Sequence, residues 1–130
     1  MDIPVTLLYG GLNGLVVTLL GVNVSRQRGT AVGIDTPLPE PLRRPVRAHG
    51  NAAEWVPIGL VLLLVLEATG AGNRFWLHLL GGTFFLGRVL HAAGALGRNA
   101  LQVAGAGLTY LVLLTMGVWA VAWRFIHYGA

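Results

Sequence analysis

The sequence predicts an all-α integral membrane protein in which residues 1–130 form one four-helix bundle domain. The composition is the first reason: 55% of the residues are hydrophobic, only 11% are charged, and the mean hydropathy is +0.68. So few charges cannot cover the surface of a soluble domain. The second reason is four apolar stretches, each long enough to cross a bilayer, which takes about 20 residues at about 1.5 Å per residue.

These four spans cover about residues 4–24, 48–69, 75–96 and 101–125. None of them alternates apolar and polar residues with period two, as the strands of a membrane barrel must, so each is predicted to be a helix. The second and third connections are short, which favours an antiparallel, up-down arrangement of neighbouring helices.

The first connection, residues 25–47, is the only long hydrophilic stretch and is rich in arginine. Four prolines interrupt it, namely Pro37, Pro39, Pro41 and Pro45. Because proline breaks the interior of a helix, we expect an extended or turned loop here and no fifth span.

The distribution of arginines predicts the orientation in the membrane. The first and third connections together carry six arginines, whereas the opposite side carries only Arg74 and Arg124. The positive-inside rule therefore places the first loop in the cytosol and both termini outside. We expect membrane lipids as partners, and no nucleic acid.

Two reactive chemistries are excluded or disfavoured by composition. The chain has no cysteine, which excludes disulfides, thiolate nucleophiles of its own and cysteine-based metal sites. Its four histidines share no common face and no i, i+4 spacing, so we expect no metal site.

Charged and polar residues inside two of the spans are the strongest functional signal. Arg47, Asn51 and Glu54 are spaced i, i+4 and i+7 on one face of the second helix, and Arg88 and His91 lie one turn apart in the third. Intramembrane charges are costly unless paired or facing a polar cavity, so they mark function by default.

The antiparallel arrangement places two of these charges at similar depth. Glu54 lies about 10 Å inward from Arg47, and Arg88 lies about 13 Å from the same surface. We therefore predict that Glu54 pairs with Arg88 across a helix interface, with His91 facing the same cavity. The alternative is that the cluster only fixes the register of the helices. Glu67, near the outer end of the second helix, is expected to be solvated.

Two sequence motifs resemble those of the MAPEG family, the membrane-associated proteins of eicosanoid and glutathione metabolism. Residues 47–54, RAHGNAAE, are similar to the R-A-H-x-N-x-x-E signature that starts the family's second helix. Residues 87–91, GRVLH, are similar to its third-helix G-R-x-x-H. The helix count and the long basic first loop agree too, so the resemblance spans nearly the whole chain and points to a bacterial, microsomal glutathione transferase-like member of the inner membrane.

The resemblance implies a homotrimer that holds glutathione between neighbouring protomers near the cytosolic face. Residue by residue, the implied cofactor-binding positions are Arg26, Arg47, Asn51, Glu54, Arg88 and His91. Glutathione carries two carboxylates, an ammonium group and a thiol, so its site needs guanidinium groups and a carboxylate. The match of Arg26 rests on its position after the first helix alone.

Three positions depart from the catalytic members of the family. Those members often carry an arginine where this chain has Gly50, a tyrosine where it has Ala95, and a fourth-helix arginine where it has Gln102 or Arg98. The usual thiolate-stabilising groups are therefore partly missing, and the resemblance implies binding of glutathione more firmly than turnover.

Arg98 and the hydroxyls of Thr109 and Tyr110 are conceivable substitutes for the missing groups. A tyrosine in a membrane helix is more often an interface or packing residue than a catalyst. No catalytic residue is therefore assigned from the sequence.

Three functions from different classes remain. The first is a glutathione transferase or peroxidase that acts on lipophilic electrophiles. The second is a non-catalytic lipid- or glutathione-binding membrane protein of the same fold, which Gly50 and Ala95 favour. The third is a small transporter or proton relay, for which four helices without inverted repeats are poor material.

Overall fold

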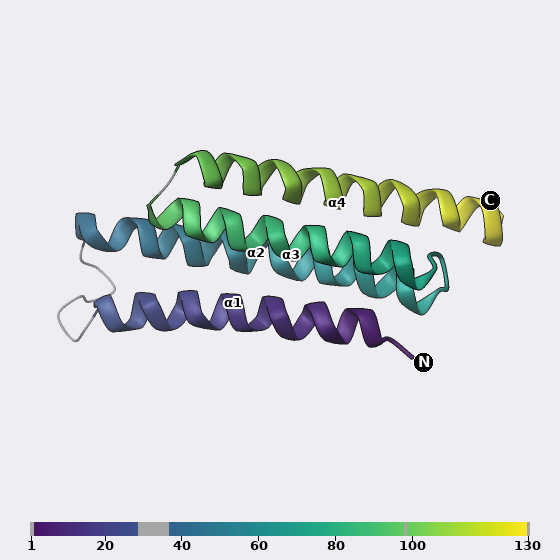
Figure 1. The fold of residues 1–130 in the computed structure, drawn as a ribbon, viewed down its shortest axis with the longest axis horizontal. Coiled ribbons are helices and arrows are strands. Elements are labelled where there is room, and N and C mark those ends of the chain that lie inside the picture. The colour runs from purple at the N-terminus through teal and green to yellow at the C-terminus, as the bar shows by residue number, and fades with distance from the viewer. Residues whose placement is uncertain (1, 29–36, 98, 130) are drawn as a thin grey trace.

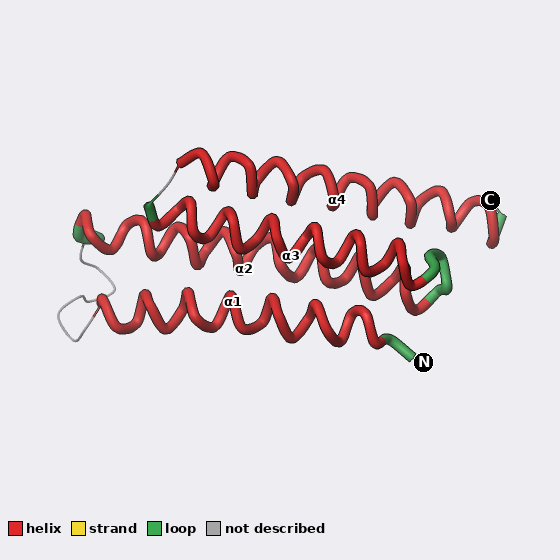
Figure 2. The backbone as a smooth tube through the Cα atoms, viewed as in Figure 1, coloured by secondary structure: helices red, strands yellow, loops and turns green. Residues whose placement is uncertain are grey.

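A computed structural model describes residues 2–28, 37–97 and 99–129. Their secondary structure is four long helices without a strand: α1 (Pro4–Arg28), α2 (Glu40–Ala68), α3 (Arg74–Leu96) and α4 (Asn99–Tyr128). The helices run up and down in turn, so both chain termini lie at the same end of the bundle (Figure 1). Figure 2 shows that nearly all of the described backbone is helical. The chain is therefore an all-α membrane four-helix bundle, as the sequence predicts.

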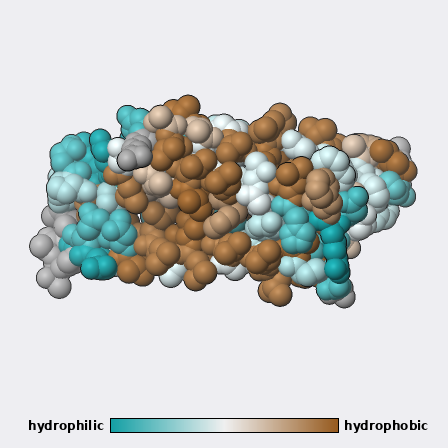
Figure 3. All heavy atoms as spheres, in the orientation of Figure 1, coloured by the Kyte–Doolittle hydropathy of each residue, from teal (hydrophilic) through white to brown (hydrophobic). Residues whose placement is uncertain are grey.

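The two ends of the bundle differ in charge. We call the end where α1 and α3 finish and α2 and α4 begin the arginine-rich end. It carries Arg26, Arg28, Arg43, Arg44 and Arg47. The opposite end, which holds both termini, is called the terminal end. On the face seen in Figure 3, a hydrophobic band separates hydrophilic groups at the two ends. All four helices are long and apolar enough to cross a membrane.

The prediction of an entirely non-helical first connection is wrong at its second half. α2 begins at Glu40, eight residues before the expected start at residue 48, and runs through two prolines of the connection. Pro41 lies in the first turn, where a missing backbone N–H costs nothing because that group has no partner within a helix. Leu42 and Pro45 are buried and hold this first part of the helix against the bundle. Residues 29–36 and Arg98 lie outside the described residues.

The two inner helices are α2 and α3, each of which packs against all three other helices. The described residues of α1 and α4 make no contact with one another, and these two helices flank the inner pair on opposite sides (Figure 1). The interface between α2 and α3 therefore lies in the middle of the bundle, with α1 on one side and α4 on the other.

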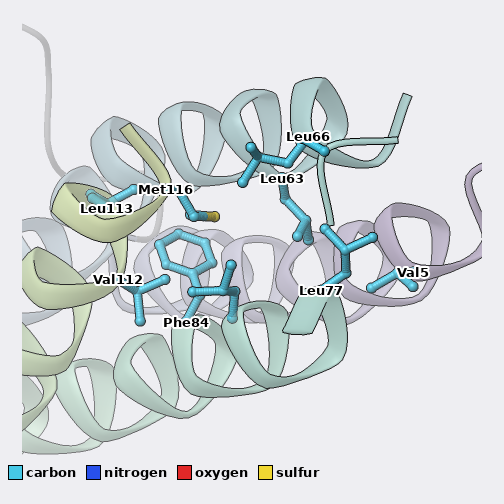
Figure 4. Packing of buried hydrophobic residues seen from close by; sticks show 10 residues of the cluster. Val5, Leu63, Leu66, Leu77, Phe84, Val112, Leu113 and Met116 are labelled. Atoms are coloured by element: carbon cyan, nitrogen blue, oxygen red, sulfur yellow. The ribbon is translucent and has the colours of Figure 1, made fainter. Parts of the chain in front are cut away.

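A hydrophobic core fills the terminal half of the bundle. Figure 4 shows Phe84 of α3 among Val112 and Met116 of α4, with Leu63 and Leu66 of α2 nearby. Phe84 is only 1% exposed, and its ring lies directly against α2. A Cβ added at Gly59 would come within 2.2 Å of that ring, so only glycine leaves room for the phenyl group. Small residues permit such close approach of helices in lipid.

At the terminal end, Glu67 joins α2 to α1. Its carboxylate accepts hydrogen bonds from the backbone N–H groups of Val5 (2.8 Å) and Thr6 (2.6 Å), in the first turn of α1. The expectation that Glu67 is merely solvated is therefore wrong. The first N–H groups of a helix have no partner inside the helix and carry partial positive charge, which a carboxylate satisfies.

Candidate functional site

The most deeply buried charge in the bundle is the guanidinium group of Arg88. The residue lies in the middle of α3 and is 1% exposed. Its Nη2 donates a hydrogen bond of 2.7 Å to Oδ1 of Asn51 on α2. This bond joins the two motifs recognised in the sequence, because each motif supplies one partner. A neutral amide oxygen satisfies one N–H of the guanidinium group but does not neutralise its charge.

The predicted ion pair between Glu54 and Arg88 is not formed within the protomer. Glu54 is exposed, and the ion pairs found among the described residues are Arg43 with Glu40 and Arg74 with Asp2. The prediction compared only the depths of the two residues along their helices. Whether two side chains meet also depends on the direction in which each points around its helix axis. Successive residues of a helix are rotated by about 100°, so Glu54 is turned about 60° from Asn51. That rotation carries its carboxylate to the outer side of α2.

His91 lies one helical turn beyond Arg88, toward the arginine-rich end. It is 7% exposed, and its ring borders a cavity. Two buried polar atoms, Nε of Arg88 and Nδ1 of His91, have no hydrogen-bond partner among the described residues. Buried polar groups are nearly always hydrogen-bonded in folded proteins. Of these two residues His91 lines the cavity and Arg88 does not, so the two unsatisfied atoms show that the polar interior beside the cavity is incompletely hydrogen-bonded within the described residues.

The cavity beside His91 has a volume of about 580 Å³ and lies between α2, α3 and α4, toward the arginine-rich end of the bundle. It is lined by Arg44, Arg47, His91, Ala95, Asn99, Gln102, Val103, Ala106 and Tyr110. Two guanidinium groups and no carboxylate occur in this described lining, so the cavity has a positive potential. A pocket of this size and charge suits a small anionic molecule.

The structure brings four of the six predicted site residues together. Arg47 and His91 line the cavity, and the Asn51–Arg88 hydrogen bond lies deeper in the bundle on the same two helices. Glu54 is on the same helix as Arg47 but faces outward. Arg26 is exposed in the last turn of α1, a helix that does not contact α4 in the described residues. Within one protomer, Arg26 and Glu54 are therefore not part of the cavity lining.

Several lining residues escaped the sequence analysis. Arg44 lies one turn before Arg47 on the same face of α2. The sequence analysis placed it in a loop because prolines flank it on both sides. Asn99 and Val103 come from the first turns of α4, whose contact with the cavity depends on how α4 packs. The spacing of Arg44 and Arg47 was the one signal that could have identified a missed residue.

The structure places the hydroxyl groups of Thr109 and Tyr110, the two alternatives from the sequence, in different surroundings. Thr109 is completely buried and donates its hydroxyl to the carbonyl oxygen of Gly105 in its own helix, at 2.8 Å. Tyr110, the next residue, lines the cavity and is 54% exposed. Its ring meets that of Trp55 on α2 edge to face, with 5.3 Å between the ring centroids.

Two of the positions at which the chain departs from the family pattern lie in the cavity. Ala95 and Gln102 both line it, on α3 and α4 respectively. The small side chain of Ala95 leaves space that a tyrosine there would fill. Gln102 offers an amide in place of a positive charge. Among the described residues, the lining on this side is thus less bulky and less basic than the family motif implies.

Comparison with known proteins agrees with this arrangement. The sequence model of the MAPEG family matches residues 6–122. The "Inner membrane protein YecN" of Escherichia coli strain K12 is 32% identical over 129 residues, covering 94% of this chain and 96% of the relative. The protein of the same name from E. coli O6:H1 strain CFT073 is similar to the same extent. The match extends from the first turn of α1 into α4 and includes both motifs that meet at Arg88, so this chain belongs to the MAPEG family.

Proposed function

We propose that this protein binds glutathione in the cavity at the arginine-rich end, and that the bound thiol serves transferase or peroxidase chemistry on lipophilic electrophiles. The observation that carries the proposal is the placement of Arg44, Arg47 and His91 around a cavity of about 580 Å³ with no carboxylate in its described lining. The family to which the chain belongs points to the same cofactor.

The donor set fits the chemistry of glutathione. Its two carboxylates are acceptors for guanidinium groups, which Arg44 and Arg47 supply at the opening of the cavity. The imidazole ring of His91 lines the same cavity. When bound, glutathione supplies a sulfur nucleophile, which this chain lacks because it has no cysteine.

The dimensions also fit. The cavity reaches from Asn99, at the start of α4, to Tyr110. These residues are about 16 Å apart along the helix axis at about 1.5 Å per residue. An extended tripeptide spans about 10 to 11 Å, so glutathione fits between the arginines and the deep end with room for the reacting atoms of a second substrate.

Two predicted site residues face away from the protomer's own cavity, which supports a site shared between protomers. The carboxylate of Glu54 is exposed about 10 Å inward from Arg47, where lipid contact is unfavourable. A neighbouring copy that covers this face removes the carboxylate from lipid and gives it a partner, either an arginine or the ammonium group of glutathione. Arg26 of the neighbouring copy then supplies a further guanidinium group. We propose the homotrimer on this basis.

A second candidate function is binding without catalysis. Ala95 and Gln102, at positions where catalytic members of the family carry tyrosine and arginine, favour it. Turnover of a lipophilic electrophile separates the two candidates, since both require glutathione to bind.

The relatives and the distribution of arginines support a location and an orientation in the membrane. The relatives from E. coli are named inner membrane proteins. We propose the same membrane for this chain, with the arginine-rich end in the cytosol and both termini outside. Glutathione then reaches the cavity directly from the cytosol.

Calorimetric titration of the detergent-purified protein with glutathione tests the proposal. We expect binding by the natural chain, and about 10- to 100-fold weaker binding after Arg47→Ala, because a hydrogen bond to a charged group contributes about 1.5–3 kcal/mol. Arg43→Ala is the matched control. Arg43 belongs to the same helix and pairs with Glu40 at 2.7 Å on the surface, but does not line the cavity.

Absence of glutathione binding by the natural chain contradicts the proposal. Equal weakening by the two arginine substitutions shows general electrostatic attraction in place of a specific site. If glutathione binds but no lipophilic electrophile is conjugated and no lipid hydroperoxide is reduced, the second candidate function is the correct one.

A further inference from the structure

Tyr110 is the one residue in the described lining of the cavity that carries a hydroxyl group. The other described lining residues are arginine, histidine, amide or apolar side chains. Thr109, the neighbouring hydroxyl, is turned into the bundle and bonded to its own helix. The hydroxyl of Tyr110 takes part in none of the hydrogen bonds found among the described residues, and the residue is 54% exposed. Its O–H is therefore free to meet a ligand.

The ring of Tyr110 is held in place by a second aromatic residue. Trp55 of α2 lies edge to face with it, at a centroid distance of 5.3 Å and an interplanar angle of 66°. Such aromatic pairs contribute about 0.5–1.5 kcal/mol beyond their burial. Trp55 is thus a positioning residue that orients the phenol from across the α2–α4 interface.

Depth assigns the phenol to one part of the proposed ligand. The guanidinium groups of Arg44 and Arg47 lie near the opening, whereas Tyr110 is the lining residue farthest along α4 from its start at Asn99. With both carboxylates on the arginines the tripeptide is bent, and its central residue points inward by about half of the 10 to 11 Å that the extended chain spans, toward His91 and Tyr110. This central residue, which in glutathione carries the thiol, is the part of the ligand nearest to the phenol.

We propose that Tyr110 is a catalytic residue of this chain, whose phenol donates a hydrogen bond to the sulfur of bound glutathione and stabilises the thiolate. The inference rests on the proposed binding of glutathione. In the ionisation step the S–H bond breaks, the electron pair stays on sulfur, and the proton passes to water at the opening of the cavity. Tyr110 keeps its own proton. A hydrogen bond to the charged form favours ionisation, and it is strengthened away from bulk water.

This assignment explains how a thiolate could be stabilised although the chain has Ala95 and Gln102 where catalytic members of the family carry tyrosine and arginine. The side chains that stabilise a thiolate in related enzymes are missing at those two positions, yet both positions border the space that Tyr110 faces. A donor from two turns farther along α4 than Gln102 therefore replaces them. The thiol accordingly sits deeper in the cavity than a donor at position 102 requires.

The test is the pH titration of the bound thiol in the full-length, detergent-purified protein. Ultraviolet difference absorbance reports the thiolate, and S-methylglutathione, which has no thiol, provides the reference spectrum. In the Tyr110→Phe variant the ring and its contact with Trp55 remain while the hydroxyl is lost. We expect the midpoint of thiol ionisation to rise by about 1–2 pH units. The affinity for S-methylglutathione should stay unchanged, because that ligand forms no thiolate.

Tyr128→Phe is the matched control, since Tyr128 is on the same helix and 62% exposed but lies outside this cavity. It should titrate like the natural chain. The inference is overturned if Tyr110→Phe also titrates like the natural chain, or if the thiol of glutathione bound to the natural chain ionises as it does free in solution; in both cases glutathione binding itself stands. Failure of the natural chain to bind either ligand overturns the proposed function, and this inference with it.

Discussion

At the residue scale, the site is organised by the hydrogen bond between Arg88 and Asn51. Arg88 is the largest side chain that is almost completely buried, and Asn51 is its partner at 2.7 Å. Sequence spacing identified both residues, because charged and polar groups inside apolar spans are rare. It chose the wrong partner, Glu54, since depth along a helix can be counted from the sequence but the direction toward a neighbouring helix cannot.

Replacing Asn51 tests the importance of this bond for stability. Asn51→Ala leaves the buried guanidinium group without its acceptor, so we expect the free energy of unfolding to fall by about 1.5–3 kcal/mol. Asn23→Ala is the control, because Asn23 accepts a hydrogen bond of 2.9 Å from Gln27 on the exposed side of α1. Denaturation followed in detergent measures both. Equal losses would show that the buried bond is no more important than a surface bond.

At the element scale, glycines decide how closely α3 and α4 approach each other beside the cavity. A Cβ added at Gly105 of α4 would lie 2.3 Å from the backbone nitrogen of His91, and one at Gly94 of α3 would lie 2.0 Å from that of Gln102. These contacts are backbone to backbone and cannot be relieved by a side-chain rotation. They fix His91 and Gln102 on adjoining walls of the cavity. Gly10 and Gly14 of α1, by contrast, have no neighbouring atom within 4 Å of an added Cβ.

A pair of glycine substitutions in α4 tests this close approach. Gly105→Ala should lower stability by about 1–3 kcal/mol and weaken glutathione binding, because α3 and α4 must separate. Gly107→Ala meets no atom within 4 Å and should leave stability unchanged or raise it by up to about 1 kcal/mol. Thermal unfolding and calorimetry measure the two effects. If Gly105→Ala behaves like Gly107→Ala, the interface is more plastic than the contact distances indicate.

The contact of Glu67 with the start of α1 leads to a second prediction, about the stability of that helix end. Glu67→Ala removes the acceptors for the N–H groups of Val5 and Thr6, at a cost of about 1–2 kcal/mol. Hydrogen exchange of those two amides should speed up. Glu40→Ala, which loses an exposed pair with Arg43, should change stability by no more than about 0.5 kcal/mol. Unchanged exchange at Val5 and Thr6 would mean that Glu67 does not stabilise this helix end.

At the scale of the whole molecule, the asymmetry between the two ends of the bundle ties the cavity to one side of the membrane. The cavity lies toward the arginine-rich end, which carries five arginines of the described helices, while the terminal end carries Arg74 and Arg124. The up-down topology places both chain termini together, away from the cavity (Figure 1). If the proposed binding of glutathione holds, the side on which the arginine-rich end lies determines which compartment supplies it.

Single-cysteine labelling tests the proposed orientation. Because the natural chain has no cysteine, Gly129→Cys and Ser25→Cys each introduce one thiol, at the terminal and the arginine-rich end respectively. A membrane-impermeant maleimide on cells with a permeable outer envelope should label Gly129→Cys directly and Ser25→Cys only after the inner membrane is opened. The reverse pattern would place the cavity outside the cytosol.

The sequence by itself determined the membrane fold, the four helices and the two motifs that meet at Arg88. These properties depend on composition and on spacing along single helices, which the chain carries locally. The tertiary structure alone decided that Asn51 and not Glu54 bonds Arg88, that Glu67 caps α1, and that Tyr110 and not Thr109 faces the cavity. Each of these choices depends on how helices are rotated and packed against one another. A rotation of about 100° separates Thr109 from Tyr110, and only the neighbouring helices determine which of them faces the cavity.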